Sequence, residues 1–150
     1  MSYFLISLLV SHIFLGTLGI VFLTGYLLYF FREDNLGFLK RMSFFAFLSF
    51  VFSWIVGGYY YVTYYGHAVK PIILSGEFPW VHKVLMETKE HIFLFLPFLA
   101  FVLFVATYFG KNIKDDKKLS YSYIGLCFTT VSIALLVTIM GMAISGAVGK

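Results

Sequence analysis

Four long runs without any Asp, Glu, Lys or Arg restrict what this chain can fold into. They cover residues 3–31, 42–66, 92–110 and 119–149. An α-helix rises about 1.5 Å per residue, so about 20 apolar residues cross the roughly 30 Å hydrocarbon layer of a bilayer. The chain is also 61% apolar, well above the roughly 45–50% of soluble domains. This pattern excludes an ordinary soluble fold and predicts an all-α integral membrane protein with the lipid bilayer as its solvent.

The bounds of the helices follow from the runs and from the prolines. Pro79 suits a first helical position, so the third helix is expected to begin there, ahead of its apolar run. Pro97, in the interior of that helix, is expected to kink it below His91. Short turns between the runs favour an antiparallel four-helix bundle. We expect one transmembrane domain over residues 1–150, with helices at about 3–31, 42–66, 79–110 and 119–148.

Basic residues gather in two of the turns and predict the topology. Seven of them flank the two short turns on one side of the bundle: Arg32, Lys40, Arg41, Lys111, Lys114, Lys117 and Lys118. The opposite side holds four lysines. The positive-inside rule then puts both termini on the outer, periplasmic or extracellular side. We expect a multi-pass protein of a bacterial or archaeal cytoplasmic membrane. The basic residues form no stripe for nucleic acid, so we expect no nucleic-acid partner.

Two histidines within the predicted spans need a functional explanation, because ionisable groups in a membrane are costly. His12 lies about 14 Å along the first helix from Tyr3, and His91 about 18 Å along the third helix from Pro79. The two imidazoles are therefore expected at comparable depth on antiparallel helices. Facing histidines of this kind can hold the two axial positions of a haem iron. The sequence predicts His12 and His91 as ligands of a haem.

Small residues occur at the same level as these histidines. His12, Gly16 and Gly19 share a face of the first helix, because their spacing is i, i+4 and i+7. A flat macrocycle between helices needs such thin backbones, whereas close helix packing produces the same pattern without a cofactor. Trp54 is placed to pack against a ring or to fill the core. The residues predicted to line the cofactor are Gly16, Gly19, Gly57, Gly58 and Trp54.

The segment METKEH, residues 86–91, brings Glu87, Glu90 and His91 onto one broad helical face. In one interpretation these groups join His12 as ligands of a non-haem iron or copper ion. In a second, Glu87 or Glu90 orients a ligand histidine or moves protons at a quinone site, and is then a catalytic residue. In a third, the turn lies in the headgroup layer and Glu87 pairs with Lys83.

His67 and His82 are expected in or beside the outer loop. A solvated loop histidine is the common outcome there, and a second metal site with Glu77 or Glu87 is the functional alternative. The candidate metal ligands are His12, His67, His82 and His91. Cys127 is the sole cysteine, so there is no internal disulfide and no Cys-x-x-Cys-His motif for covalent haem. Any haem is therefore expected to be non-covalent haem b.

The first-helix segment SHIFLGTLG, in which His12 is followed by glycines, resembles small four-helix membrane b-type cytochromes. It is also loosely similar to membrane proteins of the copper-resistance domain D group and to haem-containing protoporphyrinogen oxidases. The resemblance covers the first helix and the His91 region. It implies a haem-binding bundle that carries electrons.

Three functions remain open at this point. The first is a haem-b protein that passes electrons between a membrane quinol and an outer-side acceptor. If it is an enzyme, we expect an oxidoreductase or a subunit of one. The second is a non-haem iron or copper protein. The third is a non-catalytic subunit of a larger membrane complex, in which glycines and histidines serve packing. All three imply a homo-oligomer or other membrane subunits, because so apolar a chain has little mass outside the bilayer.

Overall fold

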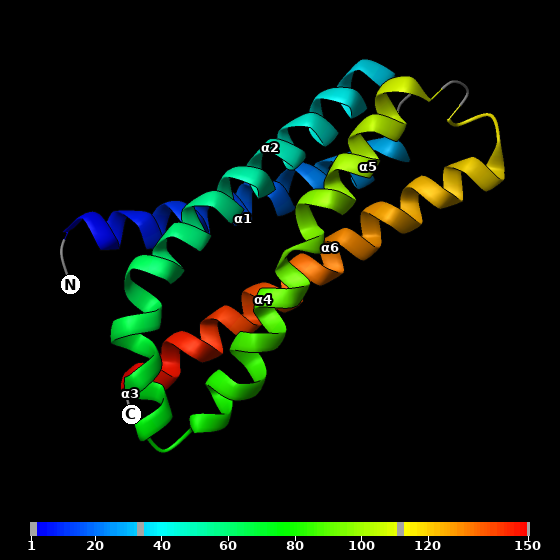
Figure 1. Cartoon of the computed structure of the whole chain (residues 1–150). Helices are drawn as coiled ribbons and strands as arrows, with labels where there is room; N and C mark the ends of the chain where they lie inside the picture. The colour runs from blue at the N-terminus through cyan, green and yellow to red at the C-terminus, as the bar shows by residue number, and fades with distance from the viewer. Residues whose placement is uncertain (1–2, 33–34, 111–112, 150) are drawn as a thin grey trace.

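A computed structural model describes residues 3–32, 35–110 and 113–149 of the chain, and this part is helical with no strand (Figure 1). Lys111 and Lys150, two of the basic residues counted for the topology, lie outside it. The helices are α1 (Tyr3–Phe30), α2 (Leu36–Tyr60), η1 (Tyr61–Val69), α3 (Lys70–Ser75), η2 (Val81–Met86), α4 (Glu87–Phe93), α5 (Phe95–Phe109), α6 (Lys117–Gly146) and η3 (Ala147–Gly149).

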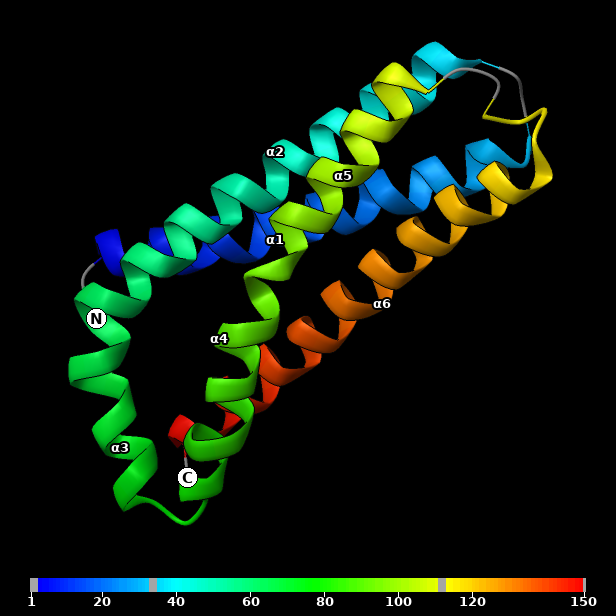
Figure 2. The same ribbon diagram turned by 45° about the vertical axis from the view of Figure 1, so that its right-hand side comes forward.

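These helices combine into four segments that are long and apolar enough to cross a membrane: Tyr3–Phe30, Leu36–Ser75, Val81–Phe109 and Lys117–Gly146. Consecutive segments run in opposite directions and form a bundle (Figures 1 and 2). α1 packs on α2, α2 on α5, α5 on α6, and α6 back on α1. The turns after α1 and α5 lie at one end, which we call the inner end. Both termini and the turn after α3 lie at the opposite, outer end.

Local side-chain chemistry defines the inner ends of the helices. The Asn35 side chain accepts a hydrogen bond from the Phe38 amide at 3.2 Å, and so caps α2. Asp116 accepts one from the Lys118 amide at 2.8 Å and caps α6. Gly110 follows α5, where the Tyr123 hydroxyl and the Ala106 carbonyl leave no space for a side chain. These turns hold neighbouring helices antiparallel.

The second helical segment is longer than predicted. It begins at Leu36 rather than 42 and runs to Ser75 rather than 66, because α2 continues without a break into the π-helix η1 and then α3. Gly66 does not end it, and Pro71 is accommodated at the start of α3, where the hydrogen-bonding pattern changes. In η1 the bonds span five residues, as from the Lys70 amide to the Tyr65 carbonyl. The outer end is therefore a helical hairpin, residues 61–86.

The third segment is broken at Leu94, which separates α4 from α5. Pro97 has no amide hydrogen to donate to the Phe93 carbonyl four residues earlier, so the ladder is interrupted there. The kink expected from Pro97 is thus present, and the helix changes direction between α4 and α5 (Figure 2). The segment is otherwise helical from Pro79 onward, which confirms the predicted start.

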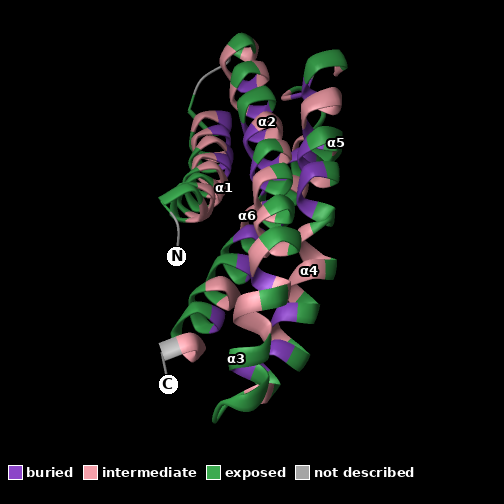
Figure 3. Cartoon of the chain, turned by 60° about the vertical axis from the view of Figure 1, so that its left-hand side comes forward, coloured by how far each residue is buried: buried purple, intermediate pink, exposed green. Residues whose placement is uncertain are grey.

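The main core cluster fills the inner half of the bundle. Exposed residues lie on the outward faces of the helices (Figure 3), and many of them are large and apolar. Leu23, Tyr26 and Leu103 are fully buried. Phe98 and Phe128, in contrast, are more than 60% exposed. A second cluster under the outer hairpin is formed by Tyr65, Ile73, Val81, Met86 and Ile144.

Candidate functional site

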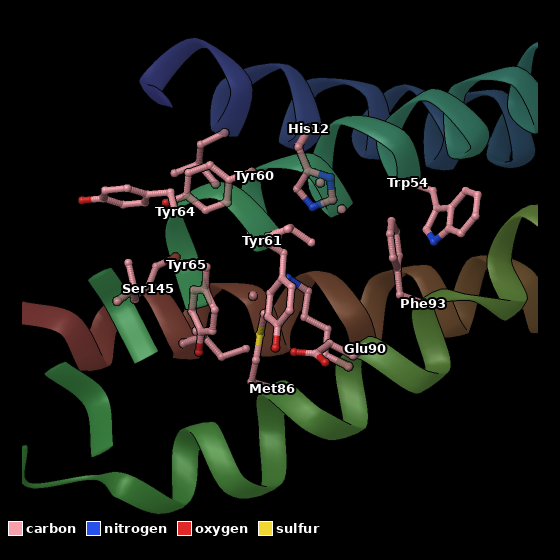
Figure 4. A pocket seen from close by; sticks show the side chains of 18 of the residues that line it. His12, Trp54, Tyr60, Tyr61, Tyr64, Tyr65, Met86, Glu90, Phe93 and Ser145 are labelled. Atoms are coloured by element: carbon pink, nitrogen blue, oxygen red, sulfur yellow. The ribbon is translucent and has the colours of Figure 1, made fainter. Parts of the chain in front are cut away.

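Two adjoining cavities lie in the outer half of the bundle, between α1, α2, α4 and α6. The first has a volume of about 540 Å³ and reaches the tyrosines of η1 (Figure 4). The second, of about 460 Å³, continues along α1 past Gly16 to Ile20. Pockets of about 300–1,000 Å³ are typical for small-molecule and cofactor sites. Residues lining both cavities include His12, Lys89, Phe93 and Gly141, so these side chains lie where the two meet.

His12 is held in one orientation by α2. Its Nδ1 lies 2.9 Å from the Ser53 carbonyl oxygen and 3.1 Å from the Ser53 hydroxyl. Because a carbonyl oxygen only accepts, Nδ1 carries the proton, and the neutral ring leaves Nε2 as an acceptor. The Ser53 hydroxyl donates to the His12 carbonyl at 3.0 Å. The Phe93 ring meets the imidazole edge-on at 5.6 Å between centroids.

Gly57 provides the space for this ring. A Cβ atom on Gly57 would lie 2.5 Å from His12 Nδ1, so any other residue would displace the imidazole. The Nδ1 edge of His12 therefore faces α2, and the opposite edge, with Nε2, faces away from α2. Neighbouring Gly58 also lines the first cavity, but a Cβ there would meet nothing within 4 Å. Gly57 thus makes room for the His12 ring, whereas Gly58 has no such close neighbour.

The remaining residues predicted to line a cofactor divide between the cavities and the core. Gly16 lines the second cavity, and a Cβ on it would lie 3.4 Å from the Ser53 hydroxyl. Trp54 lines the first cavity and is 45% exposed. Gly19 instead packs against the Phe50 ring, where a Cβ would lie 2.7 Å away. Gly19 therefore serves close packing of α1 on α2.

Polar side chains from η1 and α4 line the first cavity, and Tyr61 and Glu90 are seen among them in Figure 4. The Tyr61 hydroxyl lies close to the Glu90 carboxyl group. Oε1 of Glu90 is buried and has no hydrogen-bond partner among the described residues. Lys89 precedes Glu90 and extends to the junction of the cavities beside Gly141. Sequence reasoning did not single out Tyr61 or Lys89, although a lysine within a span was a usable signal.

Of the three residues of α4 predicted to share one broad face, Glu90 lines the first cavity whereas Glu87 and His91 do not. Both are exposed, and His91 Nδ1 donates to the Glu87 backbone carbonyl at 2.6 Å. Neither residue lines the two cavities to which Lys89, Glu90 and Phe93 belong. The structure therefore places His12 at the cavities and His91 outside them, and does not bring the two imidazoles to face each other there.

His67 lies in η1, just past the predicted end of the second helix at 66, and His82 lies in η2, within the predicted third helix 79–110. His67 is exposed on η1. His82 in η2 is 2% exposed, and its Nδ1 lies 3.0 Å from the Tyr65 hydroxyl. Its Nε2 is buried and has no partner within the described residues. The Tyr65–His82 pair joins the two helices of the outer hairpin, and sequence reasoning missed Tyr65.

A multi-ligand metal site is not formed by the described residues. No three His, Cys, Asp or Glu side chains within 3–32, 35–110 and 113–149 are grouped closely enough to hold a metal ion. His12 would therefore offer a single nitrogen donor to a group bound in the cavities. Such an arrangement suits a cofactor that brings the other ligands of its own metal, as a porphyrin does.

Comparison of the chain with models of known protein families, with curated proteins and with solved structures found no match.

Proposed function

We propose that this chain is a multi-pass membrane protein that binds haem b in the outer cavities, with His12 as an iron ligand, and transfers electrons. The observation that carries the proposal is the fixed His12 ring, with Nδ1 on the Ser53 carbonyl and Nε2 turned away from α2. Histidines that ligate metals characteristically donate their other nitrogen to a carbonyl or carboxylate in this way.

The distribution of side chains supports insertion in lipid. The outward faces carry large apolar groups such as Phe98 and Phe128, whereas buried positions between helices include Ser43, Ala46 and Thr130. Small and hydroxyl-bearing residues at helix contacts are typical of membrane bundles, since lipid gives no hydrophobic force between helices. A soluble protein with this exposed apolar surface would aggregate.

The lengths of the helices support a common depth for the residues of the site. Measured from the inner ends of their helices, His12, Gly57 and Glu90 lie at about 27, 31 and 28 Å. The hydrocarbon layer is about 30 Å thick. With the basic turns in the cytoplasm, the cavities then lie at the outer boundary of this layer, and the hairpin 61–86 lies beyond it. Both termini are outside in this topology.

Three features of the site fit haem b. His12 offers a nitrogen ligand, the cavities offer volume, and Phe93 and Trp54 offer aromatic contact. When bound, the iron would supply one-electron redox chemistry. At the lipid boundary the site is accessible to a membrane quinol and to an acceptor on the outer side. Glu90, beside Tyr61, is placed to take a proton at the cavity.

The test is haem binding by the detergent-purified chain and its His12→Ala variant. We expect a Soret band with sharpened α and β bands after dithionite in the parent protein. His12→Ala should weaken haem binding by about 100-fold or more, since it removes a direct ligand. His67→Ala, on the exposed face of η1, is the matched control and should leave the spectrum unchanged.

Three other results would overturn the proposal. If His12→Ala binds haem like the parent and His91→Ala does not, the iron is held on the other face of α4. A colourless parent protein that takes up no haem in titration would favour a role as a structural subunit. A colourless protein with stoichiometric iron or copper would favour a non-haem metal protein.

A further inference from the structure

Lys89 has an unusual position for a lysine near a membrane boundary. Its side chain lines both cavities, together with His12 and Gly141. A Cβ on Gly141 would lie 3.3 Å from the Lys89 ammonium nitrogen, so the glycine on α6 provides the space for it. The side chain is thus accommodated between α4 and α6 by a specific small residue.

A lysine at this depth commonly extends its ammonium group to water. Lys83, on the preceding turns, is exposed in this way. The Lys89 ammonium lies beside Gly141 at the cavities, and it has neither a hydrogen bond nor an ion pair among the described residues. Glu90 is the neighbouring opposite charge, but its carboxyl group lies toward Tyr61. A cation at an apolar cavity without a paired anion favours a ligand that brings one.

We propose that the outer cavities bind an amphipathic ligand with a carboxylate group, and that Lys89 is the residue that binds this carboxylate. The apolar body of the ligand would occupy the cavities beside Phe93 and Leu9. Haem b has this chemistry, with an apolar macrocycle and two propionates, so the inference deepens and rests on the proposed function. A fatty acid has it as well.

Glu90 modulates the same interaction with the opposite sign. Its buried Oε1 has no partner in the described part of the chain, and it lies next to the lysine that receives the ligand. A ligand carboxylate bound at Lys89 is therefore repelled by Glu90. Removing the Glu90 charge should strengthen binding of a carboxylate ligand, whereas removing the Lys89 charge should weaken it.

The experiment compares two pairs of ligands that differ in the carboxylate alone. The first pair is haemin and haemin dimethyl ester, titrated into the full chain in detergent and followed by the Soret band. The second, iron-free pair is parinaric acid and its methyl ester, followed by fluorescence. For Lys89→Met we expect about ten-fold weaker binding of each acid, as for loss of a charge-assisted hydrogen bond. Binding of the esters should change by less than about two-fold.

Three variants serve as controls. Lys83→Met removes an exposed lysine and should leave all four affinities unchanged. Lys89→Arg keeps the charge and should retain the preference for the acids. Glu90→Gln should bind the acids a few-fold more tightly than the parent does, without changing the esters. A thermal melt of each variant in detergent shows whether Lys89→Met is folded, and Lys89→Gln replaces it if it is not.

The outcomes separate this inference from the proposed function. If haemin and its ester both fail to bind while parinaric acid is preferred over its ester through Lys89, the haem proposal is wrong and the carboxylate site stands. If haemin binds through His12 but Lys89→Met affects acids and esters equally, the haem proposal stands and the Lys89 inference is overturned. No binding in either pair would overturn both.

Discussion

The inner and outer halves of the bundle differ in how their polar groups are satisfied. In the inner half the Tyr26 hydroxyl lies 3.0 Å from the Thr107 hydroxyl, which itself donates to the Leu103 carbonyl at 2.7 Å. The Tyr123 hydroxyl donates to the Ala106 carbonyl at 2.6 Å. The packing around these groups is apolar and dense. In the inner half, the hydroxyl groups of Tyr26, Thr107 and Tyr123 therefore have hydrogen-bond partners within the chain.

The outer half contains the opposite arrangement. His82 Nε2 and Glu90 Oε1 are buried without partners among the described residues. Two cavities separate the helices, and η1 and η2 carry π-helical turns, which are frequent at functional sites. Unpaired buried polar groups cost free energy. We therefore expect the inner half to contribute most of the free energy of unfolding and the outer half to contain the proposed binding site.

The largest effect on stability is expected in the inner half. Leu23 is fully buried, so Leu23→Ala should lower the free energy of unfolding by about 2–5 kcal/mol through the cavity it leaves. Ligand affinity in the folded fraction should be unchanged. Circular dichroism during unfolding with increasing denaturant in detergent measures the free energy of unfolding. Ligand titration measures the affinity. A large loss of affinity without loss of stability would contradict the division between the halves.

Gly57→Ala tests the outer half with a matched neighbour. The new methyl group would overlap the His12 ring, so we expect at least about ten-fold weaker haem binding and a loss of about 1–3 kcal/mol in the free energy of unfolding, as for overpacking. Gly58→Ala meets open space and should be neutral or stabilising by up to about 1 kcal/mol. Equal behaviour of the two variants would show that His12 is not confined by α2.

Tyr65→Phe is expected to weaken the outer hairpin and to spare the inner core. It removes the partner of His82 Nδ1 and leaves a buried imidazole without a hydrogen bond, which costs about 1–3 kcal/mol. Amide hydrogen exchange should accelerate in residues 61–86 and stay unchanged in α5. Uniform acceleration along the chain would mean that the two halves unfold as one unit.

The smallest effect is expected for Tyr26→Phe. It removes the hydroxyl contact with Thr107, but the Thr107 hydroxyl keeps its bond to the Leu103 carbonyl. Hydrogen bonds between membrane helices average about 0.6 kcal/mol, and the loss of free energy of unfolding should be near this value. A loss above about 2 kcal/mol, measured by the same denaturant titration, would show that this pair holds the inner half together.

The sequence allowed the four long helices to be predicted, because charge-free runs of sufficient length have few other stable states in lipid. The interruption caused by Pro97 was also predictable from its missing amide hydrogen. Counting along the helices placed His12, His91 and the glycines at one level, and of these His12 and Gly57 line the first cavity whereas His91 does not. For these features, the lengths of the charge-free runs and the local chemistry of single residues are sufficient for a prediction.

The direction in which His91 faces was not predictable in the same way. Its placement opposite His12 assumed α-helical phase from Pro79 onward, but η2 has hydrogen bonds that span five residues, as from the Glu87 amide to the His82 carbonyl. A changed hydrogen-bonding register rotates every later residue about the helix axis. The Tyr65–His82 contact depends on the register of the hairpin, which no local pattern in the sequence specifies.

The break at Leu94 has a consequence for the rate at which a ligand exchanges. α4 carries Lys89, Glu90 and Phe93 at the cavities, while α5, beyond the break, carries Leu103 in the core. Because the ladder is interrupted between them, we expect α4 to move relative to α5 more readily than it would in an unbroken helix. Ligand entry and release are therefore expected on the microsecond-to-millisecond timescale of hinge motions, rather than on the timescale of unfolding of the whole bundle.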